Sequence, residues 1–327
     1  MPVKSYGFAI GNLRAKENRL LKNSDLIQLA GASSVEQLSS MLRDKGYTTD
    51  SLTADVPELL RVSASKLWEY LNEISPDDGI FRPFLLENDF HNLKAALKAL
   101  VRNQKPDNYF LLPATVDTTV IKNAVLERKF EILPEFMQAA AEHACEILLS
   151  SGDSQLCDAL LDKACMDTQL CLVNQKDYSC KLCREIINKT ITFKNIKAAL
   201  RCAKTKKSGA FIDQTLADTA FPSKSALKTA ALNGEDEVLE LLQSCGGELY
   251  SAAQSYKKSP SCFERFCEDA VMEIAKKAKH VTFGFEPIIG YYMARTAEIK
   301  NIRIIYSGIK TGQQEEKITE RLRALYG

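Results

Sequence analysis

Apolar residues recur along the chain at intervals of three and four, the spacing that predicts amphipathic helices, while the alternation typical of strands is scarce. Ser33 and Glu36 have the spacing of a capping box, in which each side chain satisfies an amide of the first helical turn. Prolines near a first-turn position mark further helix starts at Pro57, Pro76, Pro134 and Pro260. The pattern predicts an all-α protein of short helical hairpins and a few longer helices.

One short pattern occurs three times: residues 90–97 read FHNLKAAL, residues 193–200 read FKNIKAAL, and residues 299–303 read IKNIR. The spacings, 103 and 106 residues, are domain-sized and exceed the roughly 20 to 50 residues of solenoid repeats. We therefore predict three quasi-repeated helical bundles, residues 1–108, 109–211 and 212–327. A pseudo-threefold arrangement of their long helices would form a funnel that a shaft could enter.

The repeated helix has two different faces. On a helix, Phe90, Leu93 and Leu97 fall within about 60° of each other, as do their counterparts in the other two copies, and this stripe is expected to pack inward. The asparagines Asn92, Asn195 and Asn301 lie on the far side. Asparagine is a mediocre helix former, so its presence at this position in all three copies indicates a hydrogen-bond partner. That partner is either a neighbouring helix or another protein. Basic residues flank the stripe at Lys94, Lys197 and Arg303, where long side chains reach water.

Composition narrows the class of protein. Apolar residues make up 45% and charged residues 26% of the 327 residues, which is typical of a folded globular chain. Lys plus Arg number 43 against 42 for Asp plus Glu, so no overall field favours nucleic acid or an anionic membrane. The sequence shows no secretion signal and no run of 18 apolar residues, so a cytoplasmic protein is expected.

Ten cysteines raise the question of metal or redox chemistry, above all Cys180 and Cys183, which would share one helical face. No second pair with zinc spacing accompanies them, and the three histidines are scattered. Reduced, buried thiols that act as small hydrophobic groups are the favoured interpretation. A metal site and a thiol redox function remain alternatives.

Catalytic signatures are missing from the sequence, including the phosphate loop of nucleotide hydrolases, the zinc-protease motif and the nucleophile elbow. We therefore expect no enzyme activity, no cofactor, no metal and no small-molecule substrate.

The segment Gly284–Ile305 closely resembles the C-subunit family of V/A-type ATPases, whose eukaryotic counterpart is the d subunit. The family's Gly-x-Glu-Pro start stands at Gly284–Pro287, and its Glu-Ile-Lys-Asn-Ile-Arg core stands at Glu298–Arg303. The resemblance implies a funnel of three bundles that sits on the membrane proteolipid ring, receives shaft subunits D and F, and transmits torque without catalysis. Such a protein would be peripheral to the membrane.

Polar positions of the long helices are the expected partner contacts: Asn92, Asn195, Arg295, Lys300, Asn301 and Arg303. The runner-up hypothesis is a helical scaffold of an unrelated cytoplasmic assembly. A thiol redox protein that uses Cys180 and Cys183 is the third.

Overall fold

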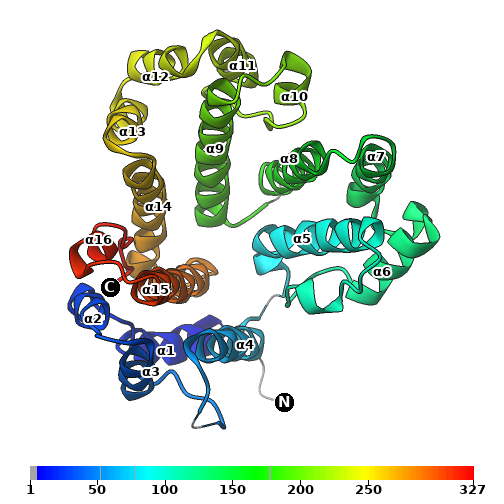
Figure 1. Ribbon diagram of the computed structural model, residues 1–327. Coiled ribbons are helices and arrows are strands. Elements are labelled where there is room, and N and C mark those ends of the chain that lie inside the picture. Colours follow the sequence, from blue (N-terminus) through cyan, green and yellow to red (C-terminus); the bar gives the residue numbers. More distant parts are fainter. Residues whose placement is uncertain (1–5, 52, 77, 177) are drawn as a thin grey trace. The chain divides into compact units, whose positions relative to one another are not determined.

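The computed structural model describes residues 6–51, 53–76, 78–176 and 178–327, and throughout these residues the regular structure is helical, with no strand (Figure 1). The predicted all-α fold class is confirmed. The chain divides into two compact units: unit 1 combines residues 1–78 with residues 254–327, and unit 2 comprises residues 79–253.

Unit 1 contains helices from both ends of the chain: α1 (Tyr6–Glu17), α2 (Asn23–Ala30), α3 (Val35–Asp44), α4 (Val56–Ile74), α14 (Pro260–Lys276), the short 3₁₀ helix η4 (Lys277–His280), α15 (Glu286–Lys310) and α16 (Glu315–Thr319). The long helix α15 is the centre of this unit, because α1 to α4, α14 and α16 all pack against it. Its core joins leucines of α2, α3 and α4 to Ile299, Ile302 and Ile305 of α15.

Unit 2 contains the middle of the chain: α5 (Arg82–Val101), η2 (Asp107–Tyr109), α6 (Thr118–Glu127), η3 (Phe130–Ile132), α7 (Glu135–Ser151), α8 (Ser154–Val173), α9 (Lys181–Lys204), α10 (Gly209–Asp213), α11 (Lys224–Asn233) and α12 (Glu235–Ser244). The 3₁₀ helix η1 (Asp78–Phe81) begins at the last residue of the first segment of unit 1 and leads into unit 2. Helix α13 (Gly247–Lys258) crosses the unit boundary. Helix α5 packs on α6, α7 and α8, while α9 packs on α8, α11 and α12.

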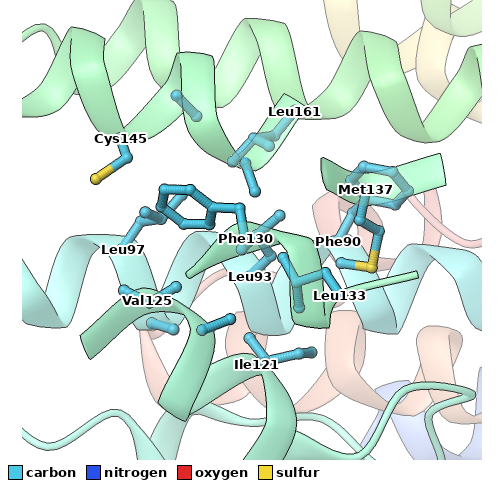
Figure 2. Packing of buried hydrophobic residues seen from close by; sticks show 14 of the residues in the cluster. Phe90, Leu93, Leu97, Ile121, Val125, Phe130, Leu133, Met137, Cys145 and Leu161 are labelled. Atoms are coloured by element: carbon cyan, nitrogen blue, oxygen red, sulfur yellow. The ribbon is translucent and has the colours of Figure 1, made fainter. Parts of the chain in front are cut away.

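The apolar stripe of α5 forms the main core of unit 2. Phe90, Leu93 and Leu97 are at most 1% exposed, and they pack against Ile121 and Met137 from the following helices (Figure 2). The corresponding stripe of α9 is also buried, and that of α15 is buried except for the half-buried Tyr306. The predicted inward face of the repeated helix is therefore confirmed.

Helix starts follow the sequence signals with two differences. Pro57, Pro134 and Pro260 stand at or next to the first residue of α4, α7 and α14. After Pro76 the described chain forms the 3₁₀ turn η1, and the α-helix begins only at Arg82.

The predicted capping box is wrong by one residue. Ser34, not Ser33, caps α3, and it accepts a hydrogen bond from the Gln37 amide at 3.2 Å. The Gln37 side chain in turn accepts from the Ser33 amide at 2.6 Å. Ser33 and Ser34 are both good caps, and glutamine can serve like glutamate at the third position, so spacing alone did not separate the two frames.

The bundle boundaries near residues 108 and 211, and the funnel, stay predictions. The contacts that the structure adds are those of the N-terminal helices, which pack on the third long helix, α15, within unit 1. Among the described residues, no helix is both long and apolar enough to span a bilayer.

Gly290 of α15 provides a test of the packing in unit 1. A Cβ atom there would stand 2.6 Å from Cβ of Ala278 and 2.7 Å from the hydroxyl oxygen of Tyr326. Alanine normally favours a helix, but here overpacking should dominate, and Gly290→Ala should lower the free energy of unfolding by roughly 1–3 kcal/mol in urea titrations.

The control is Gly11→Ala on α1, where a Cβ would meet nothing within 4 Å. This variant should be as stable as the parent or up to about 1 kcal/mol more stable. Equal stability of the two variants would show that α15 is not packed as described.

Candidate functional site

The three repeated asparagines make the same contact in the structure. The side-chain amide of Asn92 donates to the carbonyl of Leu111 at 3.0 Å and accepts from the Leu111 N–H at 2.7 Å. Asn195 makes the same pair with Ala217, at 2.8 and 3.0 Å, and Asn301 makes it with Arg323, at 3.1 and 2.8 Å. Each residue bound in this way follows its asparagine by 19 or 22 positions. We call this two-bond contact the asparagine clasp.

The clasp satisfies polar groups that are out of reach of water. All three asparagines are fully buried. Removing one partner of such a bond would leave a buried N–H and a buried C=O without a partner, which is costly. The clasp therefore fixes the segment that follows each long helix onto the middle of that helix. Of the two partners that the sequence left open, the structure shows a bond within the chain.

An acidic residue three positions before the asparagine binds further backbone in two of the three copies. Asp89, three residues before Asn92, accepts from the backbone N–H groups of Thr115 and Val116 at 2.7 and 3.0 Å. The same position in the third copy is Glu298, which accepts from the backbone N–H of Leu21 at 2.5 Å. Thr192 replaces the acid in the second copy. Sequence reasoning did not single out this position, although an acid three residues before the asparagine occurs twice.

Glu298 also forms an ionic network inside unit 1. Its carboxylate accepts from the Tyr47 hydroxyl at 3.0 Å and pairs with Arg295. Burial raises the pKa of the Glu298 carboxyl, and the Arg295 guanidinium partly offsets that effect. Arg295 donates further to the Ser63 hydroxyl at 3.0 Å. Arg295, one of the expected partner contacts, is thus mostly occupied within the chain.

A basic cleft lies between α5, α8 and α9 of unit 2, with a volume of about 590 Å³. Five basic side chains line it: Lys94, Lys194, Lys197, Arg201 and Lys207. Three acidic residues also line it, Glu87, Asp158 and Asp162, which leaves an excess of two positive charges. Lys94 pairs with Asp162 and Lys194 with Glu87, each at 2.6 Å.

The position of this cleft follows from the repeat. Lys94 stands two residues after Asn92, and Lys197 stands two residues after Asn195, so equivalent positions of α5 and α9 face one cavity. The asparagines point to the covered side of each helix, and the lysines point to the open side. The equivalent residue of α15 is Arg303, which is exposed in unit 1.

The six expected contact residues thus divide into two groups. Asn92 and Asn195 lie in unit 2, and the other four lie on α15 in unit 1. Lys300 is half exposed and pairs with Glu268 at 2.7 Å. Lys300 and Arg303 are thus exposed, whereas the three asparagines are occupied within the chain. Contact of these residues with a partner stays a prediction.

The cysteines are mostly buried, and all of them are free thiols. Cys180 caps the N-terminus of α9, where its sulfur accepts from the Cys183 N–H at 3.4 Å. Hydrogen bonding to Cys180 and burial raise the pKa of the Cys183 thiol, which keeps it protonated. Across the described residues, no three His, Cys, Asp or Glu side chains gather as a metal site would require.

The described chain is thus an all-helical protein in which one long-helix motif occurs three times, with a buried clasp on one face and basic residues on another. A family model described as the ATP synthase (C/AC39) subunit matches residues 9–321. The chain belongs to this family.

Curated relatives match over nearly the whole chain. The chain is 24% identical over 320 residues to the C subunit of a V-type sodium ATPase from Enterococcus hirae, covering 96% of this chain and 97% of the relative. It is also 24% identical to the C subunit of an A-type ATP synthase from Methanocaldococcus jannaschii, covering 98% of this chain and 86% of that protein. The corresponding A-type protein from Thermococcus gammatolerans is 23% identical, covering 96% of this chain and 89% of that protein.

The clasp predicts a large stability loss on replacement of one asparagine. Asn195→Ala should leave the Ala217 N–H and C=O buried without partners, and the free energy of unfolding should fall by roughly 2–4 kcal/mol in denaturant titrations. Lys204→Ala, a replacement of an exposed residue on the same helix, should change it by less than about 0.5 kcal/mol. If Asn195→Ala matched Lys204→Ala in stability, the clasp would have no structural role.

Proposed function

We propose that this chain is the central-stalk component of a prokaryotic V/A-type rotary ATPase, where it joins shaft subunits D and F to the membrane proteolipid ring. It carries torque for ATP-driven ion transport or ATP synthesis and catalyses no reaction itself. The observation that supports the proposal most strongly is the family match, which covers residues 9–321. The names of the relatives, which are C subunits of V-type and A-type enzymes, agree with it.

The basic cleft and the basic residues of α15 are the proposed shaft contacts. The excess of two positive charges in the lining of the basic cleft, together with the exposed Arg303 and the ion-paired Lys300 on α15, complements an acidic segment of a partner. Charge on a surface steers encounter and sets orientation more than it adds affinity. The proposal therefore gives the basic residues the task of docking the shaft in one orientation.

Torque transmission further requires a protein that does not deform. An exposed ion pair contributes only about 0 to 1 kcal/mol, so surface pairs alone would not hold the long helices in place under load. The buried clasps supply this stiffness, because each one ties a long helix to the segment that follows it. On this proposal the asparagines act on the shaft indirectly, as internal supports of the helices that carry the contacts.

Membership of an ATP synthase subunit family disfavours a scaffold of an unrelated assembly. A thiol redox role is disfavoured by the burial of Cys180 and Cys183 and by the raised pKa of the Cys183 thiol. We propose a cytoplasmic location, peripheral to the membrane and held there by the ring.

Deletion of the gene tests the proposal directly. Membranes from the deletion strain should lose ATP-driven ion pumping, and the catalytic subunits should move to the soluble fraction, because the link between shaft and ring is missing. Return of both properties on expression of the chain from a plasmid is the control. Normal pumping by membranes of the deletion strain would contradict the proposal.

Charge reversal tests the contact surface. Lys197→Glu with Arg201→Glu changes the cleft by four charge units, and binding to the purified complex of shaft subunits D and F should weaken about tenfold or more at low salt. The matched control is Lys257→Glu with Lys258→Glu, two exposed residues at the end of α13. Equal loss in both variants, measured by calorimetry, would place the shaft contact elsewhere.

A further inference from the structure

A second hollow, separate from the basic cleft, opens at the surface of unit 1, has a volume of about 140 Å³ and includes the exposed Lys16 and Lys66 in its lining. One face of α4 lines it with Ser63, Lys66, Leu67 and Tyr70, which follow the spacing of a single helical face. Helix α15 adds Tyr291 and Arg295, α1 adds Lys16, and the turn after α3 adds Gly46 to Thr48.

Three cations face this hollow. Lys16 lies over the ring of Tyr70, with its nitrogen 3.6 Å from the ring centroid, and Lys66 donates to the carbonyl of Thr48 at 3.1 Å. Arg295 also lines the hollow, and an ion pair with Glu298 holds its guanidinium in place. Among the described residues that line the hollow, none carries a carboxylate.

The charge balance leaves two positive charges without a counter-ion in the lining. Glu298, which does not line the hollow, balances the positive charge of Arg295 through their ion pair. The charges of Lys16 and Lys66 remain. Neutral donors are present too, because the Ser63 hydroxyl accepts its bond from Arg295 and keeps its own proton to donate.

We propose that this hollow binds a phosphate group. A phosphate dianion matches the excess of two charges, and its oxygens can accept from both lysines, from the remaining N–H groups of Arg295 and from Ser63 at once. A carboxylate has only two oxygens and one charge. The volume is below the roughly 300–1,000 Å³ of pockets for drug-sized ligands, so one phosphate group fits inside and an attached nucleoside would lie outside.

This site does not depend on the proposed shaft contact, since all of its residues belong to unit 1 and none of them lines the basic cleft. The bound group can be free phosphate or the terminal phosphate of a nucleotide. Both are species that an ATPase handles, so occupancy would report their concentration to this part of the complex.

Isothermal titration of the full chain with inorganic phosphate, ADP and acetate, at constant ionic strength, tests the proposal. Inorganic phosphate should bind saturably with one site per chain, and Lys16→Ala with Lys66→Ala should weaken binding about tenfold or more. Lys257→Ala with Lys258→Ala removes the same charge from exposed positions and should leave the affinity unchanged. Circular dichroism and urea titration establish that each variant is folded.

The titrations with inorganic phosphate and with ADP distinguish the two sources of the phosphate group. Binding of inorganic phosphate with weaker binding of ADP assigns the site to the free ion, and tighter binding of ADP assigns it to a nucleotide tail. Acetate that binds as tightly as phosphate would overturn the assignment to phosphate. Heat that never saturates, or equal losses in the two double variants, would show that only general charge attraction is present and would overturn the site itself.

Discussion

The fold of this chain depends on one recurring interaction, the two hydrogen bonds between a buried asparagine amide and the backbone of a single later residue. A backbone N–H and C=O that leave a helix and enter the core must find partners, and water is not available there. Asparagine supplies a donor and an acceptor with nearly the geometry of another peptide group. Each clasp therefore lets the chain turn back across its own long helix without leaving polar groups unsatisfied.

The clasp also explains how one helix can serve two tasks. Because Asn92 and Asn195 hold the covered side of α5 and α9, the opposite side stays open, and equivalent basic positions there face one cleft. Stability comes from the buried face, and under the proposed function recognition comes from the exposed one. This separation would suit a torque-carrying part, since substitutions that tune a partner contact need not touch the bonds that hold the helices.

The sequence predicted the helical class, the three copies and the inward stripe, because these depend on local spacing and composition. It did not reveal the partner of Asn92, Asn195 and Asn301, because Leu111, Ala217 and Arg323 share no residue type: the clasp binds backbone, which has no signature in the side chains. The role of Asp89 was missed for the same reason. The basic cleft combines residues of α5, α8 and α9, and the pairing of distant helices does not follow from periodicity.

The third copy uses the acidic position differently. Asp89 binds backbone groups 26 and 27 positions downstream, whereas the partners of Glu298 lie in the N-terminal part of the chain. Leu21 and Tyr47, 277 and 251 positions away, complete its bonds. A buried carboxylate without such partners would be costly, so the helices of the N-terminus must pack on α15 for this charge to be tolerated. The Glu298 carboxylate also holds Arg295 beside the hollow of unit 1. The packing of the N-terminal helices on α15 is therefore linked to the proposed phosphate site.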